Sequence, residues 1–170
     1  RAEEGRPELC LLDIGLPHIY IWGNAELVSH DHLLQMKEPW LNATGWTIRA
    51  AIYFALWIIW AWRLRALSLK FYEDRAPETE LKRRKWAAAG LVMIVLTLTL
   101  ASVDWVMSLE PKWYSSMFGI SFTIGCGLAA FAYVTFLLTQ LVRTRAMAEI
   151  LKPSHLRDLG NLMLAFVMLW

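Results

Sequence analysis

The hydrophobic positions of this chain are gathered into long runs separated by short polar segments. Three runs are long enough to cross a hydrocarbon core of about 30 Å, which takes about 20 residues of helix, and they cover 46–64, 86–109 and 113–142. A fourth run, 159–170, reaches the end of the sequence, and we expect it to be the start of a further span. The pattern predicts an all-α, polytopic transmembrane helical bundle, with residues 1–170 forming one integral-membrane domain.

The region before the first span has a different character. Residues 11–22 are apolar but too few to span a bilayer, and they include Pro17 and His18. We therefore expect an interfacial segment, or the tail of a helix that begins upstream. Residues 23–45 are mostly polar and predict a segment outside the membrane, in which Trp40 would act as an interfacial anchor, as would Trp46 at the start of the first span.

Composition agrees with a membrane protein. The chain is 57% hydrophobic, has a mean hydropathy of +0.38 and contains ten tryptophans, which is unusual for a soluble domain of this size. The two cysteines are far apart and form no CxxC, CxxCH or four-cysteine pattern, so this stretch shows no motif for haem or an iron–sulfur cluster. Because the sequence opens on Arg1 and closes within an apolar run, we expect it to be part of a longer chain.

The distribution of basic residues predicts an orientation. Lysine and arginine are concentrated in two predicted loops, 63–85 and 143–158, whereas 23–45 and the short turn at 110–112 contain few of them. Pro77 is expected to break any helix that continues from the first span. The positive-inside rule then puts the basic loops in the cytoplasm and the 23–45 segment outside the cell.

One acidic residue lies inside a predicted span. Asp104 is near the outer end of the second span, and Arg49 is at a similar depth in the first. A carboxylate in an apolar helix is costly unless it is paired, so we expect these two side chains to meet if the helices touch. The pair would be part of a proton route to the outer face, or a structural ion pair that fixes helix packing.

Small residues recur in the third predicted span. A stripe of small side chains at intervals of four residues predicts close approach of another helix; its members are Ser115, Gly119, Thr123 and Gly127. The tight turn at 110–112 would join the second and third spans into an antiparallel hairpin.

Histidines of the outer region are the remaining candidate groups. His30 and Asp31 precede a second histidine, but the sequence has no HExxH or comparable frame, so we predict no metal site. His18 would exchange a hydrogen bond with a quinol hydroxyl or cap a helix.

Two sequence blocks resemble a known family. The block HDHLLQMKEPWLN at 30–42 leads into the Trp-rich first span, and the block DWVMSLEPKWYSSMFG covers 104–119. Together they resemble the F-type membrane subunit of bacterial alternative complex III, which is related to the polysulfide-reductase (NrfD-like) membrane anchors. The resemblance covers about His18 to Trp170, and family members have roughly ten membrane helices.

The resemblance implies a respiratory, electron-transport role in the bacterial inner membrane. Such complexes oxidise menaquinol or ubiquinol and pass the electrons to haem c and iron–sulfur clusters in partner subunits. The F-type protein itself binds no haem or cluster and is not catalytic alone, but it is implicated in proton translocation. Quinone or quinol would bind in the complex.

The implied partners are other subunits and lipids, with no nucleic acid. They are a homologous NrfD-like membrane subunit, an iron–sulfur/molybdopterin-like subunit, multihaem cytochrome c subunits and a terminal oxidase. Carried over by motif, the candidate proton-route or quinol-side residues are His30, Asp31, Lys37, Asp104, Glu110 and Lys112.

Two other functions fit the same pattern. A purely structural anchor of an NrfD-like oxidoreductase would use all of these charges for assembly. A secondary transporter would instead place polar groups near the midplane of broken helices. The second span has no such break and its acid is near one end. A transporter is therefore the least favoured of the three functions.

Overall fold

The computed structural model describes residues 10–142 and 153–170, and every regular element in these ranges is a helix. Three helical stretches are long and apolar enough to span a membrane: Ala43–Asp74, Pro77–Leu109 and Phe118–Leu141. The all-α class is therefore as predicted. The chain divides into two compact units, Arg1–Ser116 and Met117–Trp170, which are described separately below.

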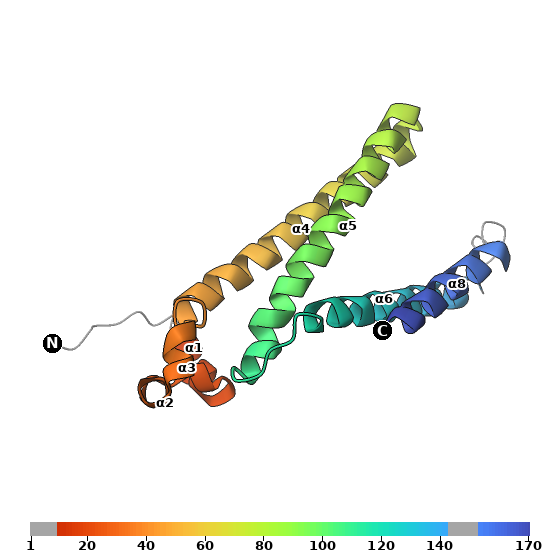
Figure 1. The fold of residues 1–170 in the computed structure, drawn as a ribbon. Coiled ribbons are helices and arrows are strands. Elements are labelled where there is room, and N and C mark those ends of the chain that lie inside the picture. Colours follow the sequence, from red (N-terminus) through yellow and green to blue (C-terminus); the bar gives the residue numbers. More distant parts are fainter. Residues whose placement is uncertain (1–9, 143–152) are drawn as a thin grey trace. The chain divides into compact units, whose positions relative to one another are not determined.

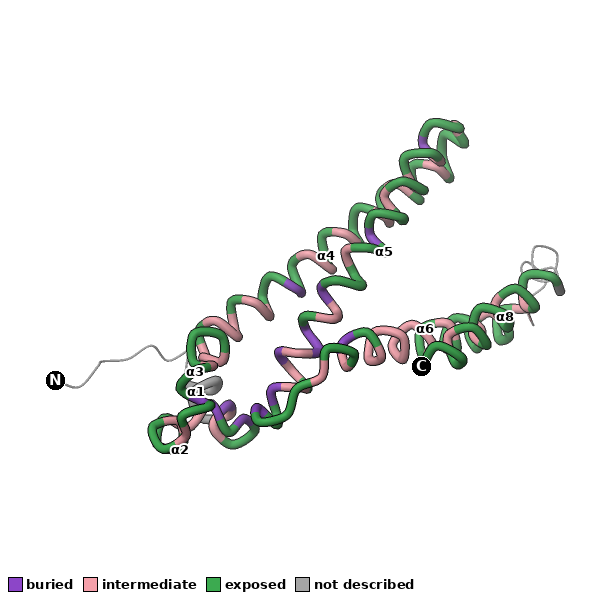
Figure 2. Tube along the Cα trace, in the orientation of Figure 1, coloured by how far each residue is buried: buried purple, intermediate pink, exposed green. Residues whose placement is uncertain are grey.

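Two long helices form the body of the first unit (Figure 1). Helix α4 covers Ala43–Asp74 and helix α5 covers Pro77–Trp105. They pack side by side and antiparallel, so that residues near the start of α4 lie beside residues near the end of α5. Most of their surface is exposed (Figure 2), and exposed apolar side chains of this kind are suited to contact with lipid or with other membrane helices.

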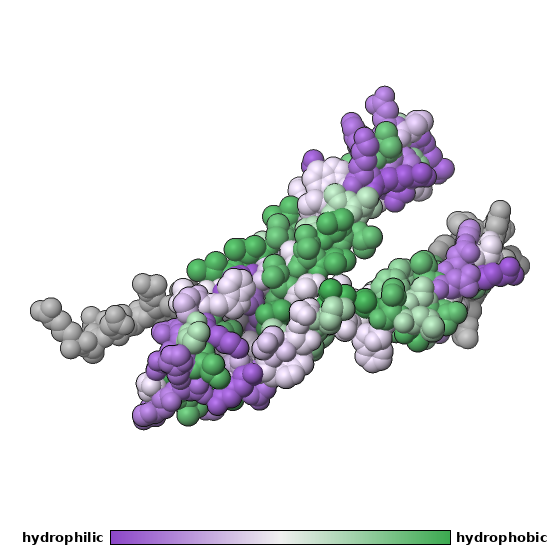
Figure 3. All heavy atoms as spheres, viewed as in Figure 1, coloured by the Kyte–Doolittle hydropathy of each residue, from purple (hydrophilic) through white to green (hydrophobic). Residues whose placement is uncertain are grey.

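Both helices are longer than the predicted spans. The 32 residues of α4 extend over about 48 Å at ~1.5 Å per residue, which exceeds a hydrocarbon core of about 30 Å. The predicted loop at 63–85 is helical apart from its centre, because α4 and α5 continue through it. Figure 3 shows the apolar middle of this helix pair and its hydrophilic end.

Local sequence explains the sharp reversal between these helices. Arg75 takes a left-handed conformation with φ 49°, and its backbone N–H closes the last turn of α4. Pro77 then starts α5 at a position where its missing N–H costs nothing. The carboxylate of Asp74 accepts hydrogen bonds from the Ala76 amide at 3.0 Å and the Thr79 hydroxyl at 2.8 Å, so the predicted break at Pro77 is confirmed.

Between residue 10, where the described part of the chain begins, and α4 there are four short helices. They are α1 (Cys10–Ile19), the 3-10 helix η1 (Ile21–Gly23), α2 (Ala25–His30) and α3 (His32–Lys37). A small apolar cluster holds them together and consists of Leu16, Tyr20, Trp22 and Leu34. The predicted outer segment is therefore folded and has its own core. We call residues 10–42 the cap.

The end of α5 differs from the prediction. The helix stops at Trp105 and is followed by a 3-10 turn, η2, at Met107–Leu109. Residues 110–117 then run without regular helix before α6 begins at Phe118. The predicted three-residue turn at 110–112 is thus a longer connection, because Pro111 cannot donate the N–H that a continuing helix would require.

The second unit contains α6 (Phe118–Leu141) and α8 (Pro153–Leu169), which pack together. Gly127 allows this approach, because a Cβ there would lie 2.6 Å from a ring carbon of Phe166. Ser115 precedes α6 and so is not part of a helical stripe, in contrast to our prediction. Gly119 and Thr123 do lie on α6, where the Thr123 hydroxyl donates to the Gly119 carbonyl at 2.8 Å.

The predicted basic loop at 143–158 is only partly described. Residues 143–152 lie outside the described residues, and 153–158 belong to α8 rather than to a loop. The fourth run predicted at 159–170 is accordingly the continuation of a helix that starts earlier.

Candidate functional site

Asp104 is completely buried in the last turn of α5, with 0% of its surface exposed. Its position is unfavourable for an anion, because the C-terminal end of a helix carries a partial negative charge. A buried carboxylate also loses its hydration and needs several hydrogen bonds in compensation. The surrounding residues supply these bonds.

Three side chains donate to the two carboxylate oxygens. Arg49 Nε donates to Oδ2 at 2.9 Å, and the Tyr53 hydroxyl donates to the same oxygen at 2.9 Å. Trp40 Nε1 donates to Oδ1 at 2.9 Å. The donors come from the cap and from α4, so the carboxylate links both to α5. We call Asp104, Arg49, Tyr53 and Trp40 the Asp104 junction.

Arg49 is itself held in place by Trp40. Its Nη2 donates to the Trp40 carbonyl oxygen at 2.9 Å, and its guanidinium carbon lies 4.3 Å from the centroid of the Trp40 ring. The cation therefore has one carboxylate, one carbonyl and one aromatic face as neighbours.

Further bonds connect the cap and the start of α4 to main-chain oxygens at the end of α5 and in η2. Trp46 Nε1 donates to the carbonyl of Asp104 at 3.0 Å, and the Ser108 hydroxyl donates to the same oxygen. The Tyr20 hydroxyl donates to the Trp105 carbonyl at 2.9 Å, and Trp22 Nε1 donates to the Ser108 carbonyl at 3.1 Å. These carbonyls are the ones that a helix leaves without internal partners at its C-terminal end.

An aromatic cluster packs beside the junction, between α4 and α5. Tyr53 and Trp57 of α4 stack at 6.4 Å between centroids, and Trp105 meets both rings edge to face at 6.0 and 5.9 Å. Phe54 stacks on Trp105 at 5.6 Å. Rings in these arrangements favour a fixed packing of α4 on α5.

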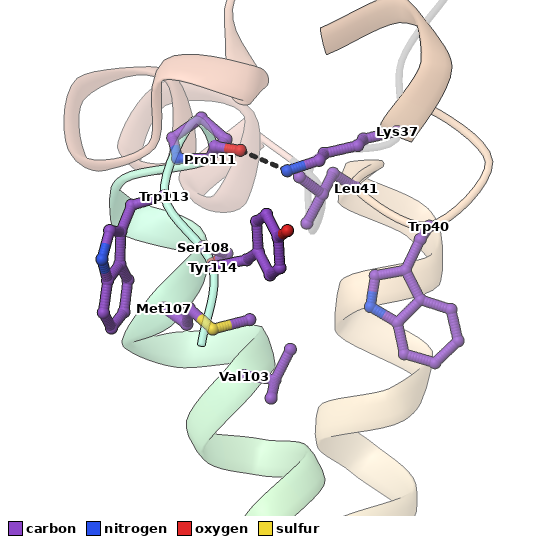
Figure 4. Close-up of a pocket in the computed structure, with 9 residues that line it drawn as sticks. All are labelled: Lys37, Trp40, Leu41, Val103, Met107, Ser108, Pro111, Trp113 and Tyr114. Carbon is purple, nitrogen blue, oxygen red and sulfur yellow. Dashed lines mark hydrogen bonds between the residues drawn. The ribbon is translucent and has the colours of Figure 1, made fainter. Parts of the chain in front are cut away.

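An apolar cavity of about 360 Å³ opens beside the junction (Figure 4). Its walls come from the cap, the end of α5 and the following connection: Lys37, Trp40, Leu41, Val103, Met107, Ser108, Pro111, Trp113 and Tyr114. The Lys37 ammonium group donates to the Pro111 carbonyl across the top of this cavity. The cap and the connection after α5 are therefore joined at this second point.

An ion pair also links the cap to the connection after α5. Lys112 Nζ lies 2.8 Å from Asp31 Oδ2, while Asp31 also caps α3 by accepting from the Leu33 amide at 3.0 Å. The hydrogen bond from Lys112 lowers the pKa of Asp31, and the same bond raises the pKa of Lys112.

Burial, reinforced by the negative charge of Asp104, raises the pKa of Tyr20.

The predicted site residues fall into two groups. The structure contains the predicted Arg49–Asp104 pair, and it places Lys37, Asp31 and Lys112 in contacts between the cap and the residues after α5. His18, His30 and Glu110 are exposed and do not line the cavity. Within the described ranges, no three metal-ligating side chains converge.

Sequence reasoning missed the neutral donors. Trp40 and Trp46, predicted as interfacial anchors, donate their indole N–H groups to Asp104, and Tyr53 was not singled out at all. A usable signal existed, because a carboxylate expected to be buried needs several donors and the nearby span contains several tryptophans and one tyrosine, Tyr53.

The arrangement is better suited to holding segments together than to moving protons. Both oxygens of Asp104 are occupied by donors, and the residue is buried.

No protein-family model and no curated protein matches the sequence.

Proposed function

We propose that this chain is a membrane scaffold subunit of a quinol-oxidising respiratory electron-transfer complex of the alternative complex III type. In this role the cap forms a rigid platform for redox subunits outside the membrane, and the Asp104 junction fixes the platform to the helices. As the resemblance implies, the electrons would pass through haem and iron–sulfur centres of partner subunits.

One observation carries the scaffold role. A single buried carboxylate joins the cap, α4 and α5 through Trp40, Arg49 and Tyr53. Such a junction is strongly destabilised when one member is lost, because the remaining charge stays buried without its partner. The cap therefore keeps its position only while α4 and α5 are correctly packed.

The assignment to a quinol-oxidising complex rests on the two sequence blocks that resemble the F-type membrane protein of that complex. Residues of these blocks form the contacts described above: Asp31, Lys37 and Trp40 come from the first block, and Asp104, Pro111 and Lys112 from the second. The blocks are far apart in sequence and meet in space, which gives their shared occurrence a physical reason.

Purification from native membranes tests the assignment. We expect multihaem cytochrome c and iron–sulfur subunits to copurify with the intact protein in mild detergent. A stable preparation that contains neither would overturn the assignment to this class of complex.

An Asp104→Asn variant tests the scaffold role. We expect less assembled complex in the membrane and normal quinol turnover per assembled complex. Normal assembly with lost proton-coupled turnover would contradict the scaffold role and support a proton route through Asp104. Glu26→Gln is the matched control, because it removes an exposed acid of the cap and should change neither measurement.

A further inference from the structure

The other end of the α4–α5 pair carries a shallow aromatic hollow. The hollow has a volume of about 260 Å³ and is lined by Trp60, Lys85, Trp86 and Ala89. The two indole rings lie 4.8 Å apart between centroids, and Trp60 Nε1 donates to the Trp86 carbonyl at 3.1 Å. This contact holds both rings in a fixed arrangement.

Gly90 makes this arrangement possible. A Cβ at this position would overlap Trp60 Nε1 and would lie 2.7 Å from Trp60 Cδ1. The Trp60 side chain therefore crosses α5 directly over a glycine, and the hollow is formed by the packing of the two helices.

Two cations border the hollow. Lys85 is one of its lining residues and is exposed to solvent. The guanidinium carbon of Arg63 lies 5.5 Å from the centroid of the Trp86 ring. Neither side chain forms an ion pair with any acidic group in the described part of the chain.

Charge along the helix pair is sharply divided. No acidic residue occurs in 50–72 or in 81–103, so the level of the hollow carries positive charge alone. The acids of this end lie nearer the turn between the helices and are Glu73, Asp74, Glu78 and Glu80. Glu80 is already bound to Arg83 and Arg84, at 2.7 Å each.

The residues of the hollow lie where the sequence of α5 changes from basic at 82–85 to apolar after Trp86. Figure 3 shows the apolar middle and the hydrophilic end of this helix pair. Tryptophan rings favour the headgroup level of a bilayer, and lysine and arginine just beyond it attract anionic lipids. A cation at this level without an acidic partner is available to a lipid phosphate.

We propose that this hollow binds the phosphate headgroup of an anionic phospholipid in the leaflet on the basic side of the membrane. Lys85 and Arg63 contact the phosphate, and the indole rings of Trp60 and Trp86 contact the glycerol region. The acyl chains then extend along the exposed apolar surface of α4 and α5. The inference rests on these helices spanning the membrane and not on the identity of the complex.

Photo-crosslinking tests this site locally. The intact protein is reconstituted into vesicles with equal amounts of phosphatidylglycerol and phosphatidylcholine, one of which carries a diazirine near the headgroup. We expect phosphatidylglycerol to label the peptides containing Trp60 and Trp86 on the order of tenfold more than phosphatidylcholine does. Equal labelling by the two lipids would overturn the proposal.

Charge variants distinguish binding at a specific site from a diffuse electrostatic attraction of anionic lipid. The double variant Arg63→Gln/Lys85→Gln should lose the preference for phosphatidylglycerol, whereas Arg63→Lys/Lys85→Arg should retain it. Lys70→Gln/Lys82→Gln removes the same charge nearer the turn and should leave the labelling unchanged. Equal loss in both glutamine variants would show a diffuse electrostatic effect and contradict the site.

Discussion

Arg49 Nε and Asp104 Oδ2 are 2.9 Å apart, and this contact joins the first turns of α4 to the last turn of α5. Only 1% of the Asp104 side chain and 17% of the Arg49 side chain are exposed. Both charges have been withdrawn from water, so each depends on the other for compensation.

Replacing Asp104 by asparagine should destabilise the protein strongly. Asparagine offers one acceptor oxygen in place of two. Its amide nitrogen is itself a donor, so the side chain that donated to the replaced oxygen would lose its acceptor. Loss of one partner of a buried pair costs about 3–5 kcal/mol, so the midpoint of thermal unfolding in detergent should fall clearly. An unchanged midpoint would show that the pair contributes little to the fold.

Tyr53→Phe should have a smaller effect in the same direction. The substitution removes the hydroxyl that donates to Asp104 at 2.9 Å and keeps the ring in its aromatic cluster. We expect a loss of about 1–2 kcal/mol. In the Asp104→Asn background the same substitution should cost less, and equal costs in both backgrounds would show that the two groups are not coupled.

The contact between the cap and the residues after α5 should weaken in acid. The pKa of Asp31 is lowered in the folded protein by its bond to Lys112, so the ion pair is intact above the ordinary carboxyl pKa and is lost as the pH falls through the lowered value. Raising the pH has no such effect until Lys112 titrates, because its pKa is raised.

Hydrogen exchange at the backbone amides of Glu110 and Lys112 measures this pH dependence. After correction for the intrinsic rate, exchange in the wild-type protein should become faster as the pH is lowered from neutral through the lowered pKa of Asp31. Lys112→Ala should exchange fast over the whole range. A wild-type protein with equal corrected rates would contradict a role for the ion pair in holding the connection.

Gly90→Ala should disturb the packing of α4 on α5. The added methyl group would overlap the Trp60 ring, and overpacking of this kind costs about 1–3 kcal/mol. Gly160→Ala is a suitable control, because nothing lies within 4 Å of a Cβ at that position of α8 and alanine favours a helix. A Gly90→Ala protein that unfolds at the wild-type temperature would show that Trp60 moves aside freely.

The lengths of the helices show where sequence reasoning reached its limit. Hydropathy predicted 46–64 and 86–109 as spans, because it measures how favourably a segment is buried in lipid. The helices continue through polar residues as far as Asp74 and from Pro77, since backbone hydrogen bonds and a packed neighbour sustain a helix outside the membrane as well. The end of α5 at Trp105 was not predicted, because it depends on the connection that follows. That connection has no hydrophobic pattern from which a helix end could be read.

The all-α class, the three apolar helices and the need of Asp104 for a partner could be predicted from the sequence, because hydropathy and the cost of a buried charge are local properties. The donors that meet this carboxylate could not be predicted, because they depend on tertiary packing. Trp40 is 64 positions and Tyr53 is 51 positions from Asp104 in the sequence, and only the packing of the cap and α4 against α5 brings them within hydrogen-bonding distance.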